Sequence, residues 1–398
     1  MTLTEENKEF IKTHLVDRRG TDNEKWDGQR AEFGTDGLLP MWIADMEFST
    51  PQPIKDALIA RVKSGVFGYP LVPQGYYDAL ANWMQTRHHT EVKAEWVRFD
   101  VGVVNALYRM VAWLTKPGEP VVIMQPVYYP FMKAIENQGR VVVSADLVQN
   151  DSGWHIDFDA LEKAFARPDV HVTILCSPHN PVGRIWTATE LAQVLALAEK
   201  YQVLVISDEI HQDFEIGGPR FTSTLSIADG RYHDNLIVLN AASKTFNLAS
   251  LRNAHIIIPD DARRADYDAF ATAHNAVAGT LLGQVATQAG YEHGGPWLTQ
   301  LIQVIRHNYG ELQAAFAAGA PDVRLSALEG TYLSFVDLGA YMKPDAIQPF
   351  VQDQCRIAVD YGAWFSPKTA TCIRMNLATD PKLVLEAAER VITALHQR

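Results

Sequence analysis

Cysteine is scarce in this sequence of 398 residues, and the few cysteines it has are far apart. Cys176, Cys355 and Cys372 are odd in number and form no CxxC pair. A disulfide framework or a thiolate zinc site is therefore not expected, and no metal is predicted. Reduced thiols of this kind are typical of cytoplasmic proteins, so we expect a cytoplasmic location.

Long apolar runs and an excess of positive charge are also missing. No apolar run approaches the ~18 residues of a membrane span, and the polar N-terminus MTLTEENKEFIKTH does not resemble a signal peptide. The sequence has 47 acidic and 35 basic residues, which gives a formal net charge of −12. We therefore expect no nucleic-acid partner and no membrane partner.

The middle of the chain alternates between apolar runs and helical patterns. A helix is predicted over 188–201, because Thr187 and Glu190 form a capping-box pattern at its start. Near-continuous Val, Ile and Leu runs separated by helices indicate an α/β domain with a parallel sheet covered on both faces. The runs predicted to be strands of this sheet are 121–124, 171–176, 203–207, 236–240 and 254–259.

The two ends of the chain have a different pattern. Residues 323–338 are predicted to form two strands around a glycine turn, and 371–377 alternates as a strand does. We therefore predict a large α/β domain over 50–290. A smaller α+β domain is predicted from residues 1–49 together with 291–398.

Polar residues follow three successive predicted strands. Asn180, Asp208 and Lys244 each come just after an apolar run, and ligands of open α/β sheets bind beyond the carboxyl ends of the strands. Alone, Lys244 would more often be a solvated loop lysine, and Asp208 a helix cap. Together they suit pyridoxal phosphate, which needs a desolvated lysine for a Schiff base and a carboxylate for its ring nitrogen.

Eight motifs along the chain occur in the order of a known family. The chain resembles the pyridoxal-phosphate enzymes of the class I/II aminotransferase superfamily, and within them the cystathionine β-lyase (C–S lyase) branch. This resemblance implies the fold-type I transferase fold, with a mostly parallel seven-stranded sheet sandwiched by helices and a smaller α+β domain. The motifs are MWIADMEF (41–48), GVFGYP (65–70), PVYYPF (126–131), SPHNPVGRIW (177–186), SDEIH (207–211), SKTFNLASL (243–251), EGTYLSFVDL (329–338) and IRMNLA (373–378).

The resemblance implies catalytic roles for the residues around the cofactor ring. Lys244 would bind the cofactor as a Schiff base and then remove the substrate's Cα proton, and Asp208 would pair with the ring nitrogen. Asn180 would hydrogen-bond the phenolic oxygen and border the carboxylate site. Tyr128, rather than its neighbour Tyr129, would stack on the ring.

The resemblance also implies a phosphate site. The segment 101–110 is predicted to be a loop that turns into a helix, with Asn105 as its cap, and backbone N–H groups at such a start bind anions. His211 is assigned a supporting role only. Ser250 and Ala254 stand where the superfamily often has glycine, which leaves the local loop geometry open. The expected phosphate contacts are the backbone of Val103, Val104 and Asn105 and the side chains of Ser243 and Arg252.

Further residues are implied for the substrate and for a partner subunit. Arg374 would bind the substrate's α-carboxylate, and strand alternation places it on one face with Cys372 and Asn376. Trp42 and Asp45 belong to the segment that lines the substrate pocket in the family, although packing is a rival interpretation for Trp42. Tyr69 would reach the partner's phosphate, which implies a homodimer.

The expected reaction is α,β-elimination from L-cystathionine and related S-substituted cysteines, giving a thiol such as homocysteine, pyruvate and ammonia. A class I/II aminotransferase, which shares the catalytic core, is the alternative enzyme. A cofactor-binding protein without turnover is a third possibility, which the intact set of site residues argues against. The pair His88 and His89 is interpreted as a solvated helix end. The preferred sulfur substrate, a biosynthetic or catabolic role and assembly beyond a dimer stay open.

Overall fold

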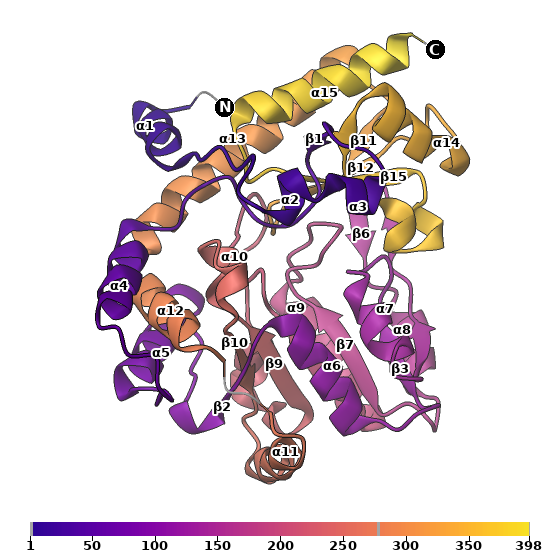
Figure 1. Cartoon of the computed structure of the whole chain (residues 1–398). Helices are drawn as coiled ribbons and strands as arrows, with labels where there is room; N and C mark the ends of the chain where they lie inside the picture. The colour runs from indigo at the N-terminus through magenta and orange to yellow at the C-terminus, as the bar shows by residue number, and fades with distance from the viewer. Residues whose placement is uncertain (1–2, 277–278, 398) are drawn as a thin grey trace.

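The computed structural model of the protein describes residues 3–276 and 279–397. Its centre is a seven-stranded sheet (Figure 1) in which β10 runs antiparallel to both neighbours and the other pairings are parallel. The predicted seven-stranded, mostly parallel sheet is confirmed. In spatial order the strands are β2 (Val97–Asp100), β10 (Ala254–Ile257), β9 (Leu236–Asn240), β8 (Leu204–Asp208), β7 (Val172–Cys176), β3 (Pro120–Ile123) and β4 (Val141–Ser144).

The three central strands are buried along their whole length, which explains their continuous apolar sequence. Successive residues of β8 point to opposite faces, so Val205 and Ile206 belong to separate apolar clusters. Val205 shares its cluster with Leu191 and Leu195 of α9, and Ile206 shares the other with Leu107 of α6. The helices on the two faces include α6 (Val103–Leu114), α7 (Pro130–Glu136), α8 (Phe158–Phe165), α9 (Ala188–Tyr201) and α11 (Asp261–Ala273).

Helix α9 begins and ends where the sequence predicted. The Thr187 hydroxyl accepts a hydrogen bond from the backbone N–H of Glu190 at 3.2 Å, and the Glu190 carboxylate accepts one from the backbone N–H of Thr187 at 2.8 Å. This capping box satisfies two N–H groups that have no partner within the helix. The prediction of this helix is confirmed.

A second, four-stranded antiparallel sheet lies in the upper part of Figure 1, beside the two long C-terminal helices. The N-terminal chain joins this part, because β1 (Leu39–Pro40) pairs with β13 (Ile357–Ala358). The domain boundaries predicted from the sequence stay a prediction. The elements of this part are β11 (Arg324–Leu325), β12 (Leu333–Asp337), β15 (Cys372–Asn376), β14 (Asp360–Tyr361), α13 (Gly295–Gly319), α14 (Pro344–Gln348) and α15 (Pro381–His396).

Helix α5 ends differently from the prediction. His88 is its last residue and is buried, whereas His89 is exposed in the left-handed conformation that ends the helix. The interpretation of the pair as a solvated helix end is therefore wrong for His88. The remaining elements are α1 (Glu5–His14), α2 (Glu24–Asp27), α3 (Gln29–Phe33), α4 (Gln52–Lys63), α5 (Gln74–His88), α10 (Ala242–Thr245), α12 (Leu281–His293), β5 (Val148–Asn150) and β6 (Gly153–His155).

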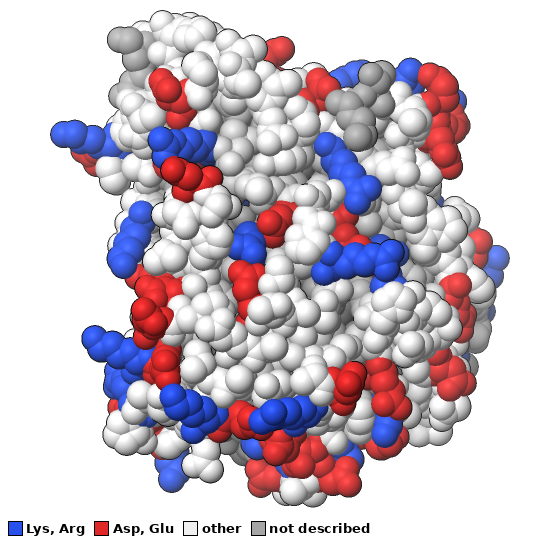
Figure 2. Space-filling model, turned by 180° about the vertical axis from the view of Figure 1, so that it is seen from behind, with Lys and Arg blue, Asp and Glu red and all other residues white. Residues whose placement is uncertain are grey.

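The surface carries charges of both signs. On the face shown in Figure 2, lysine and arginine side chains alternate with aspartate and glutamate side chains, and large areas between them are uncharged. Among residues 3–276 and 279–397, no helix has the length and apolar character needed to cross a membrane.

Candidate active site

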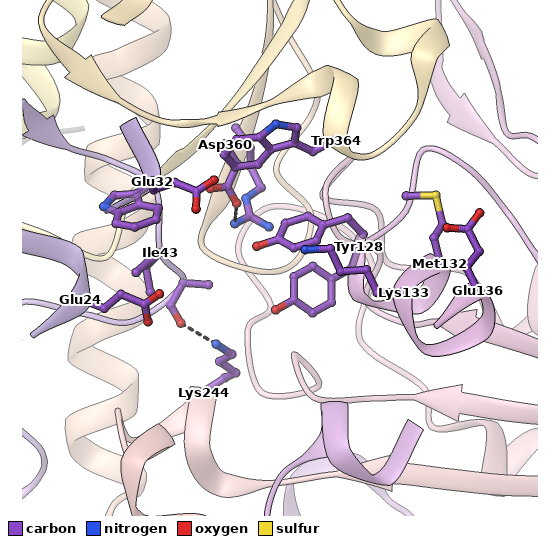
Figure 3. A pocket seen from close by; sticks show the side chains of 14 residues that line it. Glu24, Glu32, Ile43, Tyr128, Met132, Lys133, Glu136, Lys244, Asp360 and Trp364 are labelled. Carbon is purple, nitrogen blue, oxygen red and sulfur yellow. Dashed lines mark hydrogen bonds and ion pairs between the residues drawn. The ribbon is translucent and has the colours of Figure 1, made fainter. Parts of the chain in front are cut away.

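Two adjoining cavities lie between the carboxyl edge of the large sheet and the smaller sheet. The inner cavity, of about 170 Å³, contains the ends of β7 and β8, the start of α6 and α10. The outer cavity, of about 510 Å³, reaches the surface between α2, α3 and α7. Both are lined by Ala44, Tyr128 and Lys244. Lys244 therefore stands where the two cavities meet (Figure 3).

Lys244 lies on the short helix α10, directly after β9. Its Nζ donates a hydrogen bond to the backbone oxygen of Ala44 at 2.6 Å. Burial lowers the pKa of this lysine to about 8, although the carboxylates of Asp45 and Asp208 act in the opposite direction. A lysine with such a pKa has a substantial neutral fraction near neutral pH, and the neutral amine is the nucleophile and the base.

Asp208 is the last residue of β8 and is buried. Its carboxylate accepts a hydrogen bond from the backbone N–H of Ile210 at 3.1 Å. This is the only hydrogen bond of the carboxylate within the described part of the chain. Burial raises its pKa to about 7. A cationic N–H placed in the inner cavity would supply the donor that this carboxylate lacks.

Arg374 is held between two buried partners. One Nη of its guanidinium donates to the side-chain oxygen of Asn180 at 2.9 Å, and the other forms an ion pair with Asp360. Asp360 stands opposite Arg374 in the pairing of β14 with β15. The Nε atom of Arg374 has no hydrogen-bond partner among the described residues. An arginine fixed in this way and bordering the outer cavity can receive a carboxylate.

Every residue of β15 is buried, so the predicted alternation does not separate an apolar face from a polar one. Arg374 is buried because β12 and β14 flank its strand on both sides. Asp360 was missed by sequence reasoning. The two-residue strand β14 gives no periodic signal, and only the paired structure shows that Asp360 faces Arg374.

The start of α6 forms one end of the inner cavity. Its N-cap is Gly102, and no side chain caps the helix, so backbone N–H groups of Val103 and Val104 are free for an anion. The prediction that Asn105 caps this helix is wrong. Asn105 lies inside the first turn, and its side chain donates to Asp100 at 2.5 Å.

Ser243 and Arg252 line the same cavity as the start of α6, as expected for a phosphate site. Arg252 is exposed, has a φ of 53° and forms no ion pair with any described residue. Of the two positions where the family often has glycine, Ala254 begins β10 and is fully buried, and Ser250 lines a neighbouring hollow with Arg252. Small side chains therefore fit at both places.

The remaining predicted site residues lie in different places. His211 is buried beside the inner cavity, and its Nδ1 atom has no hydrogen-bond partner among the described residues. Burial lowers the pKa of His211 well below the usual range. Trp42 lines the outer cavity and also packs, with its indole N–H donating to the Lys25 backbone oxygen at 2.9 Å. Asp45 lines neither cavity and instead pairs with Arg18 at 2.7 Å. Tyr69 is fully exposed in a separate hollow.

The geometry fits a phosphorylated, cationic heteroaromatic cofactor. Four groups of the inner cavity and its border can take a further partner. Among the described residues, the Asp208 carboxylate has no ion pair and a single hydrogen bond, the His211 Nδ1 atom has no hydrogen bond, the start of α6 has no side-chain cap, and Arg252 has no ion pair. Tyr128 is partly buried here, and its backbone N–H donates to the Asn180 backbone oxygen at 3.0 Å. In the described residues, no group of three His, Cys, Asp or Glu side chains could hold a metal ion.

Comparison with known proteins defines the class. The family model of aminotransferase class I and II matches residues 44–391, and the chain belongs to this family. Cystathionine beta-lyase PatB of Bacillus subtilis (strain 168) is 36% identical over 95% of this chain and 98% of its own length. Protein MalY of Escherichia coli (strain K12) is 32% identical over 95% of this chain and 96% of its own.

Solved structures agree with the family. Cystalysin from Treponema denticola, which contains a pyridoxal 5'-phosphate cofactor, matches with a TM-score of 0.92 and 33% identity over 96% of this chain and 98% of its own. The PLP-bound C-S lyase from Staphylococcus hominis matches with a TM-score of 0.89 and 28% identity over 96% and 97% of the two chains. The predicted fold-type I architecture is confirmed.

Proposed function

We propose that this protein is a pyridoxal-phosphate-dependent carbon–sulfur β-lyase that cleaves L-cystathionine and related S-substituted cysteines. The observation that carries the proposal is the position of Lys244, whose pKa is lowered to about 8, where a cavity containing Asp208 meets one containing Arg374. The relatives named cystathionine beta-lyase or C-S lyase cover nearly the whole chain and support the reaction class.

The residues of the inner cavity would hold the cofactor. Lys244 would anchor it, Asp208 would pair with its ring nitrogen, and the start of α6 with Ser243 and Arg252 would bind its phosphate. Tyr128 would cover the ring, and Asn180 would border its oxygen. When bound, pyridoxal phosphate supplies an electron sink for the negative charge that develops at the substrate's Cα.

The residues of this chain then position the substrate and move its proton. Arg374 binds the α-carboxylate, because its guanidinium is held in place by Asn180 and Asp360. The Nζ atom of Lys244 takes the Cα proton, since burial keeps a neutral amine available near pH 8. Expulsion of the β-thiolate and hydrolysis of the remaining three-carbon unit give a thiol, pyruvate and ammonia.

We also propose a homodimer. A continuous stretch at the end of α4 and beyond it exposes large apolar side chains, and Tyr69 and Leu71 are 106% and 91% exposed. Such a surface favours association with a second copy, in which Tyr69 would reach the partner's phosphate site. The exposed members of the stretch are Ile59, Val62, Val66, Phe67, Tyr69 and Leu71.

We place the enzyme in cytoplasmic sulfur amino-acid metabolism, with methionine metabolism as the context that L-cystathionine suggests. The three cysteines are free and buried, which suits a reducing compartment. An aminotransferase is the second candidate, because the family includes relatives such as the aspartate aminotransferase of Bacillus sp. (strain YM-2), 25% identical over 89% of this chain.

The proposal is tested by a product assay on the purified, cofactor-loaded protein with L-cystathionine and no added keto acid. Pyruvate and free thiol are expected in equal amounts. The Lys244→Ala variant is expected to lose turnover, whereas Lys12→Ala, which changes an exposed lysine of α1, keeps it. Amino transfer that appears only after a keto acid is added would overturn the lyase assignment in favour of an aminotransferase.

A further inference from the structure

Charged side chains line the mouth of the outer cavity. Glu24 of α2 and Glu32 of α3 lie on the wall formed by the N-terminal segment, and Lys133 lies on the opposite wall, on α7, where Glu136 follows it at the end of the helix. Figure 3 shows the two glutamates on one side of the cavity and Lys133 with Glu136 on the other. The side chains of Glu24, Glu32 and Lys133 are exposed.

These three residues form no ion pair with any residue in the described ranges, unlike their neighbours. On the same N-terminal segment, Lys25 pairs with Glu47 at 2.9 Å and Arg18 pairs with Asp45 at 2.7 Å. Lys25 and Arg18 are thus neutralised within the protein. Glu24, Glu32 and Lys133 can instead pair with charged groups of a molecule that enters the cavity.

Tyr129 connects the two walls. The ammonium group of Lys133 lies 4.9 Å from the centre of its ring. Burial first, then the charges of Asp360, Glu32 and Glu24, raise the pKa of the Tyr129 hydroxyl to about 12, with Arg374 opposing. Both glutamates therefore act on the same small volume that Lys133 borders, and this volume lies on the way from Arg374 to the solvent.

The inner end of the cavity fixes the direction of the substrate. The buried Arg374, with its unpartnered Nε, would hold the α-carboxylate of the cysteine half, and Lys244 stands at its Cα. The substituent on sulfur then extends into the outer cavity of about 510 Å³. The walls that it meets carry the carboxylates of Glu24, Glu32 and Glu136 and the ammonium group of Lys133, besides the Arg374–Asp360 ion pair.

We propose that the outer cavity is a subsite for a distal amino-acid head group, in which Glu24 and Glu32 bind the ammonium and Lys133 binds the carboxylate of the thiol half. This inference rests on the proposed lyase function and deepens it. The subsite selects S-substituted cysteines whose substituent ends in a zwitterion. It contributes nothing to substrates whose substituent is a plain alkyl chain.

The test compares four substrates with one cysteine half and chains of equal reach. L-cystathionine carries both distal charges, S-(3-aminopropyl)-L-cysteine only the ammonium, S-(3-carboxypropyl)-L-cysteine only the carboxylate, and S-propyl-L-cysteine neither. Values of kcat/KM and KM are measured for the cofactor-loaded protein and its variants. The variants are Glu24→Gln, Glu32→Gln, their combination and Lys133→Met, with Glu6→Gln on the exposed part of α1 as the matched control.

The expected pattern is specific to the charge removed. Each glutamine variant lowers kcat/KM for L-cystathionine and the aminopropyl substrate by about two- to fivefold, as for an exposed ion pair, mainly through KM. Lys133→Met has the same effect on L-cystathionine and the carboxypropyl substrate only. S-propyl-L-cysteine is unaffected by all of the variants, and Glu6→Gln affects no substrate.

Results that overturn the subsite alone can be distinguished from a result that overturns the proposed function. If all four substrates are cleaved and no variant changes the ratios of kcat/KM between them, the subsite is wrong and the lyase function stands. The same conclusion follows if a variant slows all four substrates equally, since that is damage to the structure. No pyruvate from any of the four substrates would instead overturn the proposed function on which the subsite rests.

Discussion

Asp208, the last residue of β8, and Asp213, five residues further on, are buried carboxylates whose pKa values the protein shifts in opposite directions. Burial raises the pKa of Asp208 to about 7. Burial alone would also raise the pKa of Asp213, but hydrogen bonds and charges from His88 and Arg87 outweigh it, and the pKa is lowered. The two carboxylates share their burial and differ in the donors around them.

The donors of Asp213 come from two separate elements. Trp83 Nε1 donates to it at 3.0 Å and His88 Nε2 lies at 2.8 Å, both on α5, and the Thr245 hydroxyl on α10 donates at 2.6 Å. Asp213 thereby links α5 to the helix that carries Lys244. It lines neither cavity and its donors all belong to the protein, so its role is structural.

Asp208 has the opposite character. Within the described residues, its carboxylate accepts one hydrogen bond, from the backbone N–H of Ile210. The carboxylate borders the inner cavity. A buried carboxylate short of donors costs stability in the empty protein and gains a partner when a cation binds. The comparison thus distinguishes Asp213, whose donors stabilise the fold, from Asp208, which we propose pairs with a cationic ligand.

The largest effect is expected from removing Asp213. The variant Asp213→Ala leaves His88, Arg87, Trp83 and Thr245 without their shared acceptor, and breaking a buried ion pair typically costs about 3–5 kcal/mol. The free energy of unfolding is measured by denaturant titration of the cofactor-free protein. Asp17→Ala, at an exposed position, is the control. A loss below about 1 kcal/mol would contradict the structural role.

The second prediction is that replacing Asp208 lowers activity without lowering stability. The variant Asp208→Asn is expected to lower kcat by about 10- to 100-fold, because a hydrogen bond to a charged group contributes ~1.5–3 kcal/mol. Its cofactor-free form should be at least as stable as the wild type, since the change removes a buried ionisable group. Steady-state kinetics and thermal unfolding are measured on the same preparations. If Asp208→Asn has the kcat of the wild type and a lower stability, Asp208 has a structural role and not a functional one.

The pH dependence of stability gives a third effect, with opposite signs for Asp208 and Asp213. Because the pKa of Asp208 is about 7 in the folded protein and near 4 in the unfolded chain, the unfolded state releases its proton first. Relative to Asp208→Asn, the cofactor-free wild type should therefore lose stability from pH 4 to pH 7, by at most ~1.4 kcal/mol per unit, and change little above that.

Asp213 should behave in the other direction. Its folded pKa is lowered, so its contribution is present above about pH 4 and is lost as the pH falls further. The stability difference between wild type and Asp213→Asn should therefore be constant between pH 5 and pH 7 and shrink in more acidic solution. Parallel pH profiles for Asp208→Asn and Asp213→Asn would contradict the distinction.

The residues at the ends of the central strands could be predicted from the sequence. Asn180, Asp208 and Lys244 were predictable, because each follows a strand whose apolar run is continuous and whose neighbours are sequential in the chain. Parallel strands carry such residues to one edge of the sheet whatever the details of the loops. The central strands and α9 were predictable for the same local reasons.

The partners that fix these residues were not predictable. Asp213 meets His88, 125 positions away in the sequence, and Asp360 meets Arg374 through a strand of two residues. No periodic pattern links such pairs, since they depend on how separate elements pack. The edge strands β2 and β4 were also missed, because β2 contains the charged residues Arg98 and Asp100 and β4 is partly exposed, so neither forms a buried apolar run.

The smallest effect tests whether Asp213 acts on Lys244 through α10. Thr245 follows Lys244 directly, and its hydroxyl donates to Asp213 at 2.6 Å. Thr245→Val keeps the shape and removes this donor, which should cost about 1–2 kcal/mol of unfolding free energy. If the bond also orients α10, kcat should fall a few-fold, with KM for L-cystathionine nearly unchanged. Thr272→Val on α11, at an exposed position, is the matched control. A stability loss without any change in kcat would confine Asp213 to the fold and separate the two carboxylates completely.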